Sequence, residues 1–245
     1  MNFIFVLLYL MLNIFSCSTT ESSSENNSLT LIEEFNLNIP EPSGLSFQTS
    51  ENILWAVSDH TGKIYKLKPN GTISQIIDIE GNDLEGIAFD ETDNTLWVVE
   101  EENRKLIHLT TAGNLLEEIQ LSVPGSSAHG LEGICLDDNH HIWVLNEKEP
   151  GILIELSSDF FIENEYELDF AIDYSGIYFD KSSRNFWIVS DESGKIFKWN
   201  PQNGKTQEFN LSVQKAEGVV FSDQDSLFYV VSDSEEKLYV FRLAK

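Results

Sequence analysis

The sequence predicts an all-β fold, a five-bladed β-propeller with four strands in each blade. One pattern of residues occurs five times, at intervals of 42 to 46 residues. Each copy alternates apolar and polar residues as strands do, and no stretch has the 3.6-residue apolar period of an amphipathic helix. A four-stranded unit of this length is typical of propeller blades. A six-bladed ring is the alternative, but it requires a further copy that the sequence does not contain.

Each copy begins with a glycine that is followed by alternating apolar residues, as in Gly86-Ile87-Ala88-Phe89. A glycine at the same point of every unit indicates either a positive φ or a close approach of two backbones near the axis. The five glycines are Gly44, Gly86, Gly133, Gly176 and Gly218.

A second strand in each copy starts with an aromatic residue and is closed by an acid. We expect the aromatic side chains to pack between blades, because such large apolar surfaces are rarely left in water. The aromatic residues are Trp55, Trp97, Trp143, Trp187 and Tyr229. The acids that close these strands are Asp59, Glu101, Glu147, Asp191 and Asp233.

The ring is predicted to close through its N-terminal strand. A third strand follows in every copy, but only the first four copies have a fourth, and the last copy stops at Lys245. Residues 31–37 match residues 115–121, the fourth strand of the second copy, almost position for position. We therefore expect residues 31–37 to complete the last blade, which leaves only short and protected strand edges.

The residues before the repeats indicate export and anchoring. The apolar run from 3 to 15 is too short to span a bilayer, and it leads into Ser16-Cys17, which resembles a bacterial lipobox. We predict a lipoprotein signal peptide at 1–16, lipidation of Cys17, a Ser-rich tether at 17–29 and a propeller at 30–245. The protein would then face outside the cytoplasm, anchored to a membrane of the cell envelope. No Lys or Arg precedes the apolar run, which departs from the usual pattern, and simple secretion is the alternative.

The composition excludes two classes of protein. With 41 acidic and 15 basic residues, the formal net charge is −26, which repels phosphate backbones and argues against nucleic acid as a partner. A hydrophobic content of 41% supports a large core and excludes wholesale disorder.

Cys135 lies in an apolar run and is predicted to be a buried small residue without a disulfide partner. We expect a monomer.

Two sets of residues are predicted to gather at one mouth of the central channel, because in a blade the first strand begins where the second ends. The residues before the glycines are Ser43, Glu85, Glu132, Ser175 and Glu217. This set varies between Glu and Ser, as a single asymmetric ligand site would. Glu85, Glu132 and Glu217 would repel one another unless a cation lay between them, and Ca²⁺ or Mg²⁺ suits such oxygen ligands. The alternative is a wide mouth with each glutamate simply solvated.

The acids that close the second strands form the other set, and they have two interpretations. They recur in every copy, so Asp59, Asp191 and Asp233 could accept backbone N–H groups of the turns that follow. They could also bind a ligand at the mouth. The predicted ligand-binding residues are Ser43, Ser175, Asp59, Glu101, Glu147, Asp191, Asp233 and His129.

The repeats resemble the SdiA-regulated (YjiK-like) propeller family. The resemblance rests on Glu-Gly-Ile/Val-x-Phe-Asp, as at 85–90, and on Trp-x-Val-Ser-Asp, as at 187–191, and it covers about residues 31–245. It implies a propeller and supplies no catalytic residue. We favour a binding protein that holds a divalent cation, a small ligand or a protein partner. A metal-dependent hydrolase, either a phytase-like phosphoesterase or a lactonase, is the alternative, and a purely structural envelope module is a third.

Overall fold

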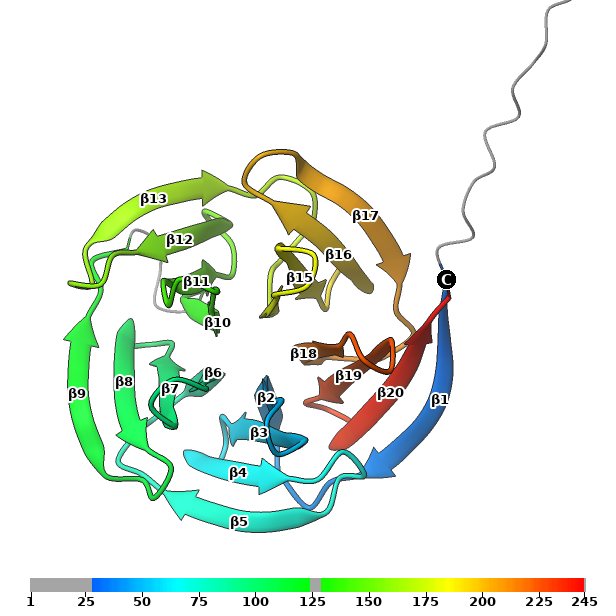
Figure 1. The fold of residues 1–245 in the computed structure, drawn as a ribbon, viewed down its shortest axis with the longest axis horizontal. Helices are drawn as coiled ribbons and strands as arrows, with labels where there is room; N and C mark the ends of the chain where they lie inside the picture. Colours follow the sequence, from blue (N-terminus) through cyan, green and yellow to red (C-terminus); the bar gives the residue numbers. More distant parts are fainter. Residues whose placement is uncertain (1–27, 124–128, 245) are drawn as a thin grey trace, which may run out of the picture.

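The computed structural model describes residues 28–123 and 129–244, and in that part the chain forms twenty strands and no helix. The strands make five four-stranded antiparallel sheets, arranged as blades around a central axis (Figure 1). The five-bladed propeller is therefore confirmed, and six blades are excluded. The predicted signal peptide at 1–16, Cys17 and most of the tether lie outside the described residues. No helix in the described part could span a membrane.

Each blade runs from an innermost strand near the axis to an outermost strand at the perimeter (Figure 1). The first blade contains β2 (Pro42–Gln48), β3 (Ile53–Ser58), β4 (Lys63–Leu67) and β5 (Ile73–Asp78). The second contains β6 (Leu84–Asp90), β7 (Thr95–Glu100), β8 (Lys105–Thr110) and β9 (Leu115–Gln120). The third contains β10 (Leu131–Leu136), β11 (Ile142–Asn146), β12 (Ile152–Leu156) and β13 (Ile162–Glu167). The fourth contains β14 (Gly176–Asp180), β15 (Asn185–Ser190), β16 (Lys195–Asn200) and β17 (Gly204–Asn210).

The last blade combines the two ends of the chain. It contains β18 (Ala216–Ser222), β19 (Leu227–Ser232), β20 (Lys237–Leu243) and, as its outermost strand, β1 (Leu29–Asn36). β1 pairs antiparallel with β20, with Phe35 opposite Leu238, and Figure 1 shows the two strands side by side. The predicted closure by the N-terminal strand is confirmed.

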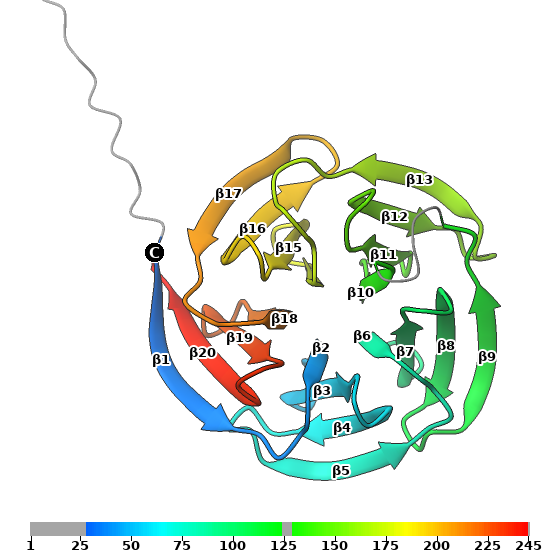
Figure 2. The same cartoon turned by 180° about the vertical axis from the view of Figure 1, so that it is seen from behind.

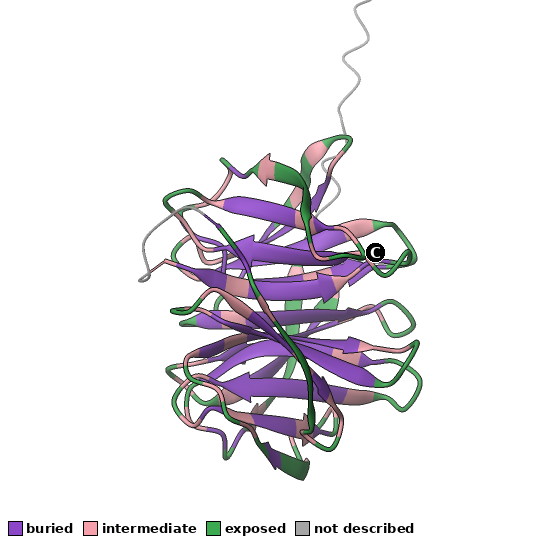
Figure 3. Cartoon of the chain, turned by 90° about the vertical axis from the view of Figure 1, so that its left-hand side faces the viewer, coloured by how far each residue is buried: buried purple, intermediate pink, exposed green. Residues whose placement is uncertain are grey.

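The core lies between the blades, as the pattern of aromatic residues predicts. Buried strands fill the disc, while the exposed residues lie mostly in loops on its two faces and at its perimeter (Figure 3). Trp55 stacks on Phe89 of the next blade with ring centroids 6.1 Å apart, and Trp187 packs on Phe221 at 5.5 Å. All five leading aromatic residues are buried. Cys135 is also buried, in agreement with the prediction, and it forms no disulfide within the described residues.

The repeat glycines form a ring at the axis, where the innermost strands touch. A Cβ atom on Gly44 would lie 2.5 Å from the carbonyl oxygen of Glu85, and one on Gly218 would lie 2.6 Å from that of Ser43. None of the five has a positive φ, so close approach rather than conformation explains them. The free space at this level is about 10 Å³, the size of one water molecule at most. The ring therefore divides the channel into two separate cavities.

Candidate functional site

The predicted residues meet at the mouth where the innermost strands begin; Figure 2 views the ring from this side. This cavity, which we call the acidic mouth, has a volume of about 190 Å³. Eight of the predicted site residues line it: Ser43, Asp59, Glu85, Glu132, Glu147, Ser175, Glu217 and Asp233. The other three contact or flank this set, as described below.

One group of carboxylates, Asp59, Asp83 and Glu85, lies between the first two blades. An oxygen from each side chain lies within 4.8 Å of an oxygen of the other two. Asp59 follows β3, whereas Asp83 and Glu85 stand at the start of β6. Asp83 has a φ of 61°, in the left-handed region that Asp tolerates, and its Oδ2 accepts the backbone N–H of Glu102 at 3.0 Å.

No cationic side chain pairs with this first group anywhere in residues 28–123 and 129–244. Burial, and then the charge of Asp83, raise the pKa of Asp59 to about 6. Burial, and then the charge of Asp59, hold the pKa of Glu85 well above its usual value. Asp59 therefore holds a proton below about pH 6, and Glu85 keeps its proton to a higher pH than a free glutamate does, unless a cation replaces these protons.

A second group, Glu101, Glu132 and Glu147, lies between the second and third blades with the same spacing. Here the carboxylates have partners: Gly130 N–H donates to Glu101 Oε1 at 2.7 Å, and His129 Nδ1 lies 2.9 Å from Glu147 Oε2. Lys148 Nζ lies 2.8 Å from Glu147 Oε1. Burial still raises the pKa of Glu101 to about 7, and burial, then the charge of Glu85, hold the pKa of Glu132 well above its usual value.

Glu217 occupies the opposite wall, apart from both groups. Burial raises its pKa to about 7, although the charge of Lys215 and a hydrogen bond from Ser175 act in the other direction. Lys215 Nζ lies 3.3 Å from Asp191 Oδ2, which places Asp191 beside the lining. Glu85, Glu132 and Glu217 thus line one mouth. They are not, however, among the groups of described residues whose carboxylate oxygens all lie within 4.8 Å of one another. A site built on these three alone stays a prediction.

The turns after the second strands are capped by a different residue from the one expected. Ser58, Ser190 and Ser232 are fully buried, and each Oγ accepts the N–H of the residue three positions later, at 3.1 Å. In the described chain no backbone N–H bonds to the carboxylates of Asp59, Asp191 or Asp233, and Asp233 Oδ1 is buried without a partner. The turn-capping interpretation of these acids is therefore wrong, because the preceding serine already supplies the acceptor.

The sequence interpretation did not select four residues that the structure places at the mouth: Asp83, Lys148, Asp173 and Glu192. Lys148 bridges Glu147 and Glu192, at 2.8 and 2.7 Å. Asp173 accepts the hydroxyl of Ser190 and the N–H of Glu192, so it also holds the turn. A signal was present, because Asp83 and Asp173 both stand three residues before a repeat glycine.

Solved structures with a similar fold include a streptogramin B lyase, at 20% identity and a TM-score of 0.54, covering 89% of this chain and 74% of that one. Virginiamycin B lyase from Staphylococcus aureus matches at 17% identity and 0.54, covering 87% and 71%. Glutaminyl cyclase from Myxococcus xanthus matches at 14% and 0.69, covering 89% and 97%. At these identities the likeness shows the fold alone.

A search of curated proteins finds no match to this sequence. The model of the SdiA-regulated family, in contrast, matches residues 28–242, which include every blade. This chain therefore belongs to the SdiA-regulated family.

Proposed function

We propose that this protein is a membrane-anchored, extracytoplasmic propeller that binds a divalent cation, Ca²⁺ in preference to Mg²⁺, at the acidic mouth. The observation that supports the proposal most directly is the first group, Asp59, Asp83 and Glu85, in which three close carboxylates have no cationic partner in the described residues. Carboxylate oxygens are the ligands that both ions prefer, and Ca²⁺ tolerates the irregular geometry of side chains from two blades better than Mg²⁺ does.

Electrostatics favours a cation over the alternatives. Without one, the repulsion between Asp59 and Glu85 is relieved by protonation, as their raised pKa values indicate. A bound Ca²⁺ would displace those protons, so its affinity should rise as the pH increases through about 6, the pKa of Asp59. The remaining coordination positions would face the cavity, where a small ligand or a protein partner can reach the ion.

The position of the N-terminal strand supports the proposed anchoring. β1 lies at the perimeter of the last blade, so a tether that precedes Leu29 joins the ring at its outer edge (Figure 1). Lipidation of Cys17 at the end of that tether would hold the propeller at a membrane as a monomer and leave the acidic mouth accessible.

The test is a thermal melt of the metal-free protein at pH 7.5, with and without Ca²⁺. A ligand at 100 times its Kd stabilises the folded state by about 2.7 kcal/mol, which corresponds to a rise in Tm of roughly 5–10 °C at this chain length. Glu85→Gln should remove most of the rise. Glu163→Gln, an exposed residue on β13, is the control and should leave the rise unchanged. A Tm that does not respond to Ca²⁺ would refute the proposal.

A metal-dependent hydrolase is the second candidate, and one observation favours it. Glu217 has a pKa of about 7 and shares a hydrogen bond with Ser175, which suits a general base. The similar solved structures are named as lyases and a cyclase, so catalysis on this fold has precedent. Phosphoesters and lactones can be assayed in the same samples. Turnover that Glu217→Gln abolishes while the Ca²⁺-dependent rise in Tm remains would favour the enzyme.

A further inference from the structure

A second cavity, which we call the lower cup, opens on the face opposite the acidic mouth. Its volume is about 590 Å³, within the range of small-molecule sites, and close to three times that of the acidic mouth. The glycine ring closes its floor, because the space at that level is only about 10 Å³. A molecule that enters the cup therefore remains on this side of the disc.

The repeat itself builds an apolar interior. The residue after each glycine is aliphatic, and at the axis these five residues close the floor: Leu45, Ile87, Ile134, Ile177 and Val219. Two positions further along each strand stands a ring of large apolar residues that lines the wall: Phe47, Phe89, Leu136, Phe179 and Phe221. Four phenyl rings around one cavity suit an aromatic or branched aliphatic group.

The wall carries two neutral polar groups. Burial raises the pKa of the Tyr178 hydroxyl and of the Cys135 thiol, so both stay protonated at physiological pH. The Tyr178 hydroxyl lines the cup and forms no hydrogen bond with any other described residue. It is therefore available to a ligand, both as a donor and as an acceptor.

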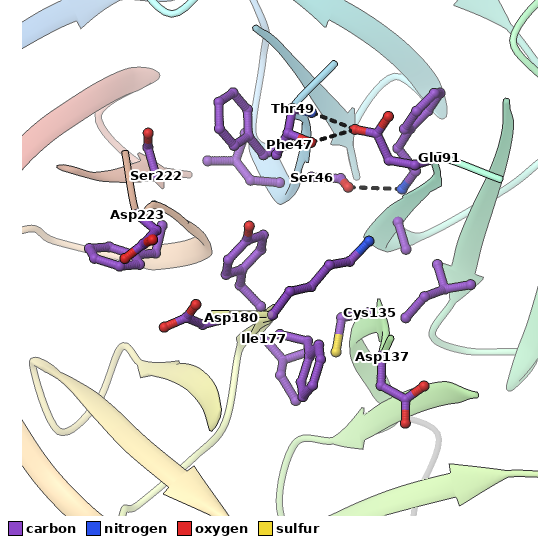
Figure 4. A pocket seen from close by; sticks show the side chains of 18 of the residues that line it. Ser46, Phe47, Thr49, Glu91, Cys135, Asp137, Ile177, Asp180, Ser222 and Asp223 are labelled. Carbon is purple, nitrogen blue, oxygen red and sulfur yellow. Dashed lines mark hydrogen bonds between the residues drawn. The ribbon is translucent and has the colours of Figure 1, made fainter. Parts of the chain in front are cut away.

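The opening of the cup is negatively charged. Six acidic side chains and a single lysine, Lys181, line the cavity. Figure 4 shows Glu91, Asp137, Asp180 and Asp223 spaced around it, with Cys135 and Ile177 between them. Burial acts to raise the pKa of Glu91, but hydrogen bonds from Ser50 and Thr49 outweigh it and lower the pKa, so this carboxylate stays ionised. Asp223 is exposed, and within the described chain its carboxylate has no hydrogen-bond or ion-pair partner. The charge selects a cation and disfavours an anion.

We propose that the lower cup binds a small organic amine, with its apolar body among the phenyl rings and its ammonium group among the carboxylates. The shape and lining require both parts: an inorganic cation would leave the apolar wall uncovered, and a neutral hydrocarbon would leave the Asp223 carboxylate and the Tyr178 hydroxyl without a partner among the described residues. This site does not depend on the acidic mouth, from which the glycine ring separates it.

The test compares three probes that share one phenyl body: phenethylamine, phenethyl alcohol and phenylpropanoate. Binding to the full chain is measured by calorimetry and by ligand-observed NMR. The amine should bind roughly tenfold or more tightly than the alcohol, as expected for one charge-assisted hydrogen bond, and the carboxylate should not bind. Equal affinity for all three probes, or no binding of the amine, would overturn the proposal.

Variants then locate the site. Asp223→Asn, at an exposed residue that should not affect folding, and Tyr178→Phe should each weaken the amine several-fold, while Leu136→Trp should block the cup. Glu85→Gln in the acidic mouth is the matched control and should leave the affinity for the amine unchanged. If Glu85→Gln weakens binding as much as Asp223→Asn does, the amine is held at the other mouth and the proposal is wrong.

Discussion

Individual carboxyl groups in the acidic mouth behave differently from those on the rest of this acidic surface. Glu208, which lies on β17 beside Lys195 and Lys205, has a pKa lowered to about 2 by these two partners. Glu217, at the start of the innermost strand β18, has a pKa raised to about 7 by burial. The same side chain thus stays charged at the perimeter and holds a proton near the axis, because the axis excludes water and gathers like charges.

This difference predicts how stability depends on pH in the metal-free protein. Glu217 and Glu101 have folded-state pKa values of about 7, against the ordinary value of 4.5, so the folded state binds more protons between these limits. The free energy of unfolding should therefore fall as the pH rises from 4.5 to about 7, and these groups contribute no slope below 4.5. Urea denaturation at pH 5 and at pH 7.5 measures the difference.

Two controls separate this effect from the general repulsion of a chain with a net charge of −26. Glu217→Gln should flatten the pH dependence, whereas Glu163→Gln on the exposed face of β13 should not. Saturating Ca²⁺ at pH 7.5 should restore the stability seen at pH 5. Greater stability of the metal-free protein at pH 7.5 than at pH 5 would contradict the assignment of raised pKa values.

At the scale of elements, the turn after the second strand has two neighbouring residues with different roles in three of the blades. A buried serine holds the turn, and the acid that follows it carries charge at the mouth. In the fourth blade, the Ser190 hydroxyl donates to Asp173 and accepts the N–H of Ser193, and the side chain is fully buried. The next residue, Asp191, contacts only the exposed Lys215 among the ion pairs of the described chain. Stability should therefore depend on the serine, and charge at the mouth on the aspartate.

Ser190→Ala should lower the free energy of unfolding by about 1–3 kcal/mol, because the Ser193 N–H loses its acceptor and the buried Asp173 carboxylate loses one of its two donors. Asp191→Asn should change it by less than about 0.5 kcal/mol, since a pair with an exposed lysine contributes little. Urea denaturation of both variants measures this. If Asp191→Asn destabilised the protein as much as Ser190→Ala does, the turn-capping role would belong to the aspartate and not to the serine.

The strands and their order were predictable, while the groups of side chains at the mouth were predictable only in part. Alternating residues and strand direction place Glu85 and Asp59 at one end of the disc. The distance between neighbouring blades then decides which further carboxylate lies beside Asp59 and Glu85, and this is Asp83 rather than Glu217. The lower cup was not predicted, because Phe47 and Phe221 follow the same alternation as core residues; only the closed ring shows that they surround a cavity.

For the whole molecule, closure depends on β1. This strand covers β20 with an antiparallel ladder from Leu29 to Asn36 that has one register shift, between Leu31 and Glu33, and Lys237 Nζ lies 3.0 Å from Glu34 Oε1 across the seam. Removing it would expose the backbone edge of β20, and unpaired edges promote association.

Deletion of residues 1–36 should therefore lower the Tm and produce oligomers, measured by thermal melting and by size-exclusion chromatography with light scattering. Deletion of residues 1–27, which leaves β1 in place, is the control and should give a stable monomer. A monomer of unchanged Tm after the longer deletion would show that the seam contributes little.

The glycine ring also decides how many repeats this chain can hold. Each glycine fits against the backbone of the neighbouring blade with no room for a methyl group, as at Gly44 against Glu85. A sixth copy would move these neighbours apart, expose the five aliphatic side chains beneath them to water, and open a channel from one face of the disc to the other. Close packing of the glycines at the centre thus limits the number of blades more strictly than the pairing of β1 with β20 at the perimeter does.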